Sequence, residues 1–351
     1  MIKQRQSNIE LLRIVSMIMI LGLHVNFYAL GSVSLQELNH RPLGATSRMF
    51  FEFLCIVAVN VFIFISGWFS INAKIKGFLK FLYQILFFYI GIYLVFVFIG
   101  ERQISWEGIQ ECFFAKKQGW FIKAYICLYI LSPILNVFVK HSNERQLRLV
   151  LIAFYIFQTI YGWYFVNATK FFAQGYSTLS FIGLYLLARY IKLYAMDKKL
   201  FSMKKEKDLI VFLSICVLET LLFVITKQNR LDDIVQILWI YSSPLVIVSA
   251  LYLLLFFSKL EISNKHINRI ALSSFTVYLF HSNPNIMPYY VKTAREIFST
   301  YSSLSCLLLM LLEIIVFYIV ATLLDYLRIV SWNALWQKFG KKIEHTFSKK
   351  L

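Results

Sequence analysis

Charged residues are scarce in this 351-residue chain: only 15% of positions are Asp, Glu, Lys or Arg, whereas 59% are hydrophobic. Soluble domains carry about one charged residue in four, so this composition excludes a soluble globular domain of this length. No stretch is long and polar enough to form a separate soluble domain. We therefore expect residues 1–351 to form one all-α domain of a polytopic membrane protein.

Acidic residues are scarcer than basic ones, and 18 Asp and Glu against 36 Lys and Arg give a net charge of +18. A basic excess can indicate a nucleic-acid partner. Here the basic side chains lie in short connections between apolar runs, so the pattern excludes nucleic acid and indicates contact with membrane lipids. We also expect no cleavable signal peptide, because the first apolar run is too long and contains Arg13.

Cysteine is rare, and its spacing excludes two kinds of site. Four of the five cysteines fall inside predicted spans and Cys112 stands alone in a loop, which argues against a disulfide framework. No C-x-x-C or Cys/His spacing indicates zinc, so we expect no metal site. The chain also lacks the glycine-rich, Walker, G-x-S-x-G and H-E-x-x-H signatures. Any chemistry must therefore use groups inside the membrane body, and we expect no bound cofactor.

Apolar runs long enough to cross a bilayer fill most of the chain. We predict ten spans, with 24 of the 36 Lys and Arg on one side, 11 on the other and Arg13 within a span. Basic residues favour the cytoplasmic side, so both termini are predicted to be cytoplasmic. The predicted spans are 8–30, 51–71, 78–100, 120–139, 147–166, 175–194, 208–226, 234–257, 270–290 and 303–327.

The first span carries the strongest polar signal. Arg13 and His24 are 11 residues apart, which in a helix places them on one face, roughly 16 Å apart along the axis. Glu10 lies three residues before Arg13, where the two can pair. An ionisable residue inside a span usually faces a cavity or a partner. Alternatively, Arg13 snorkels to the interface and His24 makes an interhelical hydrogen bond.

A second histidine, His281, lies in the predicted span 270–290 and is followed by Pro284 and Pro288. These prolines predict that the helix breaks after His281. Irregular backbone at this depth is expected only where it lines protein or water. His281 is thus a second candidate functional residue, although a packed interfacial histidine is the alternative.

Three further polar side chains lie within predicted spans: Ser66, Glu219 and Glu313. A carboxylate at such a depth is costly unless it is paired or hydrogen-bonded. Either glutamate could orient a histidine, as carboxylates do in catalytic triads, or could make a structural interhelical bond. We treat these three residues, together with Glu10, as possible support for the site.

Several segments of the chain resemble segments of the membrane-bound acyltransferase family 3 proteins, and they follow one another in the same order as in that family. Arg13 and His24 match the family's R-x10-H pattern in the first helix. The chain departs from the family at Ala188, where glycine is usual, and at KFLYQILFFY (80–89), where arginines and a proline are common. The other similar segments are VNVFIFISGWFSI (59–71), GWFIKAYICLYILSPILN (119–136), GYSTLSFIGLYLLARYIKLY (175–194) and FTVYLFHSNPNI (275–286).

The resemblance implies transfer of an acyl group, usually acetyl, from a cytoplasmic thioester such as acetyl-CoA. The acceptor is a sugar hydroxyl on an exported or lipid-linked glycan of the cell envelope, which implies a multi-pass cell-membrane protein. Arg13 and Arg189 are the candidates for holding the donor phosphates. His24 either deprotonates the acceptor hydroxyl or accepts the acyl group covalently, and His281 is the second catalytic candidate.

Two other functions are compatible with these patterns. A non-catalytic carrier or flippase for a lipid-linked glycan also needs many spans, buried polar residues and kinked helices. Such a carrier would not need a histidine as proton acceptor. A purely structural membrane scaffold leaves the predicted same-face Arg13 and His24 without a purpose.

The basic-residue bias predicts that the connection 101–119, an amphipathic surface segment, faces outward and that the connection near residue 200 faces the cytoplasm. Single cysteines replacing Gln110 and Leu200 in a cysteine-free background should react with a membrane-impermeant maleimide from opposite sides of sealed membranes. Labelling of both positions from one side would contradict this topology.

Overall fold

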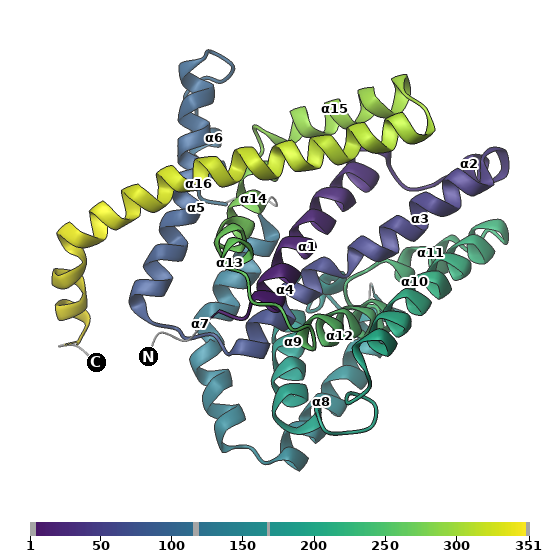
Figure 1. The fold of residues 1–351 in the computed structure, drawn as a ribbon, viewed down its shortest axis with the longest axis horizontal. Helices are drawn as coiled ribbons and strands as arrows, with labels where there is room; N and C mark the ends of the chain where they lie inside the picture. Colours follow the sequence, from purple (N-terminus) through teal and green to yellow (C-terminus); the bar gives the residue numbers. More distant parts are fainter. Residues whose placement is uncertain (1–4, 115–118, 167–168, 349–351) are drawn as a thin grey trace. The chain divides into compact units, whose positions relative to one another are not determined.

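The computed structural model describes residues 5–114, 119–166 and 169–348, and the described part of the chain contains helices and no strand (Figure 1). Seven helices of these residues are long and apolar enough to cross a membrane. The prediction of an all-α polytopic membrane protein is therefore confirmed, whereas the number of ten spans stays a prediction. The seven are Ser7–Ala29, Pro42–Phe69, Ile75–Phe98, Trp120–His141, Glu144–Tyr164, Lys205–Gln228 and Leu304–Gly340.

The predicted continuous span 234–257 is wrong. The segment forms two helices, α11 (Asp232–Leu238) and α12 (Pro244–Ser258), which are separated by five residues. Pro244 occupies the first turn of α12, where its missing N–H costs no hydrogen bond. A proline in this position begins a helix, whereas in a continuous span it would interrupt the hydrogen-bond ladder.

The predicted span 270–290 is also discontinuous, for the reason its prolines indicated. Helix α14 (Ser274–His281) ends at His281, and α15 (Met287–Thr300) begins with Pro288 in its first turn. The eight residues of α14 extend only about 12 Å, which is less than the hydrocarbon thickness of about 30 Å. The predicted break after His281 is confirmed.

The chain divides into two compact units, each of which is described by itself. The first unit comprises Met1–Ile71 and Trp120–Ala271, and the second comprises Asn72–Gly119 and Leu272–Leu351. Each unit is thus assembled from two separate stretches of the sequence.

In the first unit, α1 (Ser7–Leu23) packs against α3, α4, α12 and α13, and α10 packs against α3 and α12. Helix α9 packs against α4, α7 and α8. The other helices of this unit are α2 (Leu35–His40), α3 (Pro42–Ile56), α4 (Ala58–Phe69), α7 (Trp120–His141), α8 (Glu144–Gln158), α9 (Thr178–Tyr190), α10 (Lys205–Gln228) and α13 (Lys265–Ile270). Shorter π or 3-10 turns are η1 (His24–Ala29), η2 (Thr159–Tyr164), η3 (Ala173–Gly175) and η4 (Ile191–Ala195).

Small residues allow α4 and α9 to approach closely. A Cβ atom on Gly67 would lie 2.5 Å from the Tyr185 carbonyl oxygen and 2.9 Å from the Ala188 Cβ. Contacts this short cannot form without a backbone shift, so the contact requires glycine on α4 and a small residue on α9. Just beyond it, Lys192 Nζ donates to the Trp68 carbonyl at 2.8 Å, which satisfies an end carbonyl of α4.

In the second unit, α16 (Ser303–Ser348) packs against α5, α14 and α15, and α14 also packs against α5. The predicted end of the last span at 327 is too early, because α16 continues without a break to Ser348. The connection 101–119 contains a short helix, α6 (Trp106–Cys112), whose Trp106 is 71% exposed. The remaining long helix of this unit is α5 (Ile75–Phe98).

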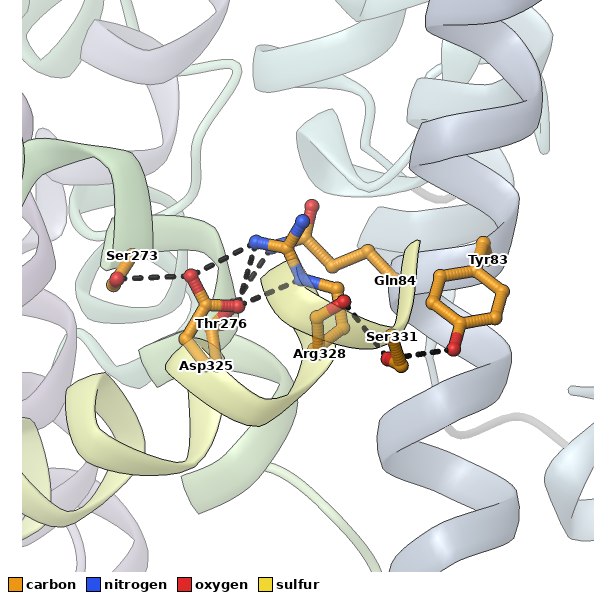
Figure 2. Close-up of polar contacts among 7 residues, drawn as sticks. All are labelled: Tyr83, Gln84, Ser273, Thr276, Asp325, Arg328 and Ser331. Carbon is orange, nitrogen blue, oxygen red and sulfur yellow. Dashed lines mark hydrogen bonds and ion pairs between the residues drawn. The ribbon is translucent and has the colours of Figure 1, made fainter. Parts of the chain in front are cut away.

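A buried ion pair joins three helices of the second unit (Figure 2). Arg328 Nη2 lies 2.6 Å from Asp325 Oδ1 and 2.8 Å from Asp325 Oδ2, and both side chains are almost fully buried. The Asp325 carboxylate also accepts hydrogen bonds from the hydroxyls of Ser273 at 2.9 Å and Thr276 at 2.6 Å. Gln84 on α5 donates to the Thr276 hydroxyl at 2.7 Å. The pair therefore fixes the start of α14 between α16 and α5.

Removing one partner of this pair should destabilise the second unit strongly. Arg328→Met leaves the Asp325 carboxylate buried without its cation, and such changes cost about 3–5 kcal/mol. The double variant Asp325→Leu/Arg328→Met removes both charges and should be much closer to wild type. Thermal unfolding of the purified proteins in one detergent gives the comparison. Equal stability of the single variant and wild type would contradict the assignment of this pair.

Candidate functional site

Helix α1 holds Arg13 and Glu10 as the sequence predicts. Arg13 Nη1 lies 3.3 Å from Glu10 Oε2, and Arg5 Nη1 lies 3.3 Å from the same oxygen. Glu10 is buried, whereas the Arg13 side chain remains 30% exposed. The carboxylate thus orients Arg13 without covering its guanidinium, which leaves donor groups for a further anion.

A pair of hydroxyl groups, those of Ser66 and Tyr125, connects α4 with α7. The Ser66 Oγ lies 3.0 Å from the Tyr125 hydroxyl and donates to the Phe62 carbonyl at 3.0 Å. Ser66 and Tyr125 therefore form a polar pair between α4 and α7.

The backbone geometry supports placing Arg13 and His24 on one face. Helix α1 is a regular α-helix through Leu23, so the turn of about 100° per residue applies between the two positions. His24 then begins the π-helical turn η1, and its ring lies edge-on to Tyr28 with centroids 5.0 Å apart. The imidazole is partly exposed. π-Helical turns are rare and recur at functional sites.

The sequence interpretation missed a polar network beside His24. Asn26 in η1 is hydrogen-bonded to Arg48 and Glu52 on α3, with Glu52 buried. The sequence does contain a signal for this network, because the Glu52 carboxylate stands among apolar residues. Because the span was predicted to begin at residue 51 whereas the helical segment begins at Pro42, Glu52 fell at a predicted helix end, where a charge needs no explanation.

His281 is fully buried at the end of α14, in the second unit. Its Nδ1 lies 2.8 Å from the Val277 carbonyl oxygen. A carbonyl can only accept, so Nδ1 carries the proton and Nε2 of the neutral ring keeps its lone pair. The rings of Tyr278 and Tyr290 each lie 5.9 Å from the imidazole, centroid to centroid. This arrangement fixes the tautomer in which Nε2 can accept a proton.

The remaining predicted site residues, Arg189, Glu219 and Glu313, lie on three different helices. Arg189 lies in the last turn of α9, and its Nε is buried without a partner among the described residues. Both Glu219 on α10 and Glu313 on α16 are buried, and within the described chain no oxygen of either carboxylate has a hydrogen-bond partner. Neither glutamate therefore orients a histidine by a hydrogen bond in this part of the chain.

The structure thus brings together Glu10 and Arg13 in the first unit, which also holds His24, Ser66, Arg189 and Glu219. His281 and Glu313 belong to the second unit. Among the residues that the structure describes, no group of three or more His, Cys, Asp or Glu side chains could hold a metal ion.

A family model for an acyltransferase domain, that of acyltransferase family 3, matches residues 6–327. The chain belongs to this family. The match spans nearly all of the helices described above, including α1 with Arg13, η1 with His24 and α14 with His281. No curated protein and no solved structure matches the chain.

If Arg13 holds a phosphate of the acyl donor, its loss should weaken donor use selectively. Arg13→Ala should raise the KM for acetyl-CoA about 10- to 100-fold, the range for losing hydrogen bonds to charged groups, with little change in the KM for the acceptor. Arg13→Lys should recover only part of the loss, because lysine lacks the planar fork. Arg102→Ala, which removes an ion pair with Glu111 elsewhere, is the control. Equal donor saturation curves for wild type and Arg13→Ala would exclude a phosphate contact.

Proposed function

We propose that the chain is a membrane O-acyltransferase that moves an acyl group, in the simplest case acetyl, from acyl-CoA to a sugar hydroxyl. The acceptor is an exported or cell-surface polysaccharide, or its lipid-linked precursor, at the cell membrane. The observation that carries the proposal is the match to an acyltransferase family over residues 6–327, in a helical body whose first helix bears Arg13 and His24.

Binding of the acyl-CoA phosphates is assigned to Arg13 and Arg189. The basic bias of the connections predicts that both lie toward the cytoplasm, where acyl-CoA is available. Guanidinium groups match phosphate geometry and remain charged at any physiological pH. The partial exposure of Arg13 beside Glu10 supports this role, because the guanidinium is oriented and still accessible.

In the proposed step, His24 acts as the general base. The neutral imidazole takes the proton from the acceptor hydroxyl as its oxygen attacks the thioester carbonyl. The tetrahedral intermediate then collapses, so that a C–O bond has formed and the C–S bond breaks. The thiolate leaves as free CoA after taking the proton from the imidazolium. A covalent acyl-histidine is the alternative course, and a neutral base has the advantage of leaving no new buried anion on the protein.

His281, which lies in the second unit, is assigned as a second functional histidine. The hydrogen bond from Nδ1 to the Val277 carbonyl sets the tautomer whose Nε2 can accept a hydrogen bond or a proton. We expect His281→Ala to impair transfer severely but less completely than loss of the base, if His281 orients the acceptor.

His24→Gln tests the base directly. Glutamine can donate and accept hydrogen bonds but is not a useful base, and loss of a positioned general base costs about 10²–10⁴-fold in rate. We expect the purified variant to retain expression, membrane insertion and acetyl-CoA binding, and to lose acetyl transfer to that extent. Transfer of ¹⁴C-acetyl from acetyl-CoA to extracted cell-surface glycan is the measurement. A near wild-type rate for His24→Gln would rule out the base.

Mass spectrometry of the surface glycan from a deletion strain distinguishes the enzyme from a carrier. Loss of one acyl mass per repeat with unchanged chain length supports the acyltransferase. Loss of the whole polymer supports a non-catalytic carrier or flippase instead.

A further inference from the structure

The segment that begins with His24 has an unusual winding. Residues His24–Ala29 form the π-helical turn η1, and Gly31 follows in the left-handed region at φ +76°. π-Helical turns are rare, so a helix does not adopt one over six residues without support from its surroundings. The position of the His24 ring thus depends on whatever holds this turn in place.

Asn26 is the point at which η1 is attached to α3. Its Nδ2 donates to Glu52 Oε2 at 2.7 Å and to the Arg48 carbonyl at 3.2 Å, and its Oδ1 accepts from Arg48 Nε at 3.1 Å. The Asn26 side chain is buried, with 6% of its surface exposed. Both ends of the amide are therefore used, and every partner is on α3.

Arg48 holds the other end of the same segment. Its Nη2 donates to the Gly31 carbonyl at 2.7 Å, and its Nη1 donates to Glu37 Oε1 on α2 at 2.6 Å. One guanidinium thus contacts three places: Asn26 within η1, Gly31 just beyond η1, and Glu37 on α2. The side chain of Arg48 is only 14% exposed, although its partner Glu37 is 27% exposed.

We infer that Arg48 and Asn26 are positioning residues for His24. They touch no reacting atom; they hold the π-helical turn so that the imidazole keeps one orientation toward the acceptor hydroxyl. The inference rests on the proposed function of His24 as the base. The planar fork of arginine suits three separate acceptors on three segments, whereas the compact ammonium of lysine cannot reach all three at once.

Arg48→Lys is the decisive variant, because it keeps the charge and removes the fork. A misplacement of about 1 Å can cost about 10²-fold in rate, so we expect kcat for acetyl transfer to fall about 10²-fold, with the KM for acetyl-CoA within about twofold. We also expect the acidic limb of the kcat/KM–pH profile to move, because the imidazole changes surroundings. Asn26→Ala should give the same pattern and serves if Arg48→Lys does not yield folded protein. Arg102→Lys is the matched control and should leave kcat unchanged.

The outcomes separate this inference from the proposed function. If the wild-type protein transfers no acetyl, or if His24→Gln is as active as wild type, the proposed function itself fails. If His24→Gln is inactive while folded Arg48→Lys and Asn26→Ala have wild-type kcat, the positioning role is overturned. It is equally overturned by a lower kcat with an unmoved acidic limb, because loss of folded enzyme lowers the rate at every pH alike.

Discussion

The cost of placing polar groups among apolar helices governs this structure. Most of the buried charged side chains have partners, such as Asp325 with Arg328, Asp208 with Lys259 and Glu52 with Asn26, whereas Glu219 and Glu313 have none among the described residues. An unpartnered ion at such a depth costs several kcal/mol, whereas a well hydrogen-bonded pair can be retained. The described residues therefore concentrate their polar contacts in a few places, and each of those places joins separate helices. These polar contacts, together with close packing such as that of Gly67 against α9, hold particular helices side by side.

The features that the sequence predicted well are those set by local chemistry. The helical membrane body follows from composition, the pairing of Glu10 with Arg13 follows from their spacing in one helix, and the end of α14 at His281 follows from the prolines beyond it. The failures concern where helices begin and end. Hydropathy identifies the apolar centre of a span and is insensitive to its polar ends. It therefore predicts an end at 327 for a helix that continues to Ser348, and a start at 51 for a helical segment that begins at Pro42.

Those misplaced ends hid the two polar networks that matter most. Arg328 lies just beyond the predicted last span and Glu52 just inside the predicted second one, where charges are ordinary. The π-helical winding of η1 was also inaccessible from the sequence, because the side chains that hydrogen-bond Asn26 within it, Arg48 and Glu52, lie more than 20 residues further along the chain. By contrast, the family resemblance found the first helix and its Arg13 and His24, and the family match over residues 6–327 agrees with it.

The π-helical turn also changes how side chains beyond His24 must be assigned to faces. Its hydrogen bonds run from residue i to i+5, so each turn holds more residues than an α-helical turn. A helical wheel drawn at 3.6 residues per turn is therefore valid from Ser7 to Leu23 and goes out of phase afterwards. Phe27 and Tyr28, for example, are partly exposed although they continue an apolar run. In an alignment with other chains, one inserted or deleted residue after His24 would mark the gain or loss of this turn, while the spacing from Arg13 to His24 would remain unchanged.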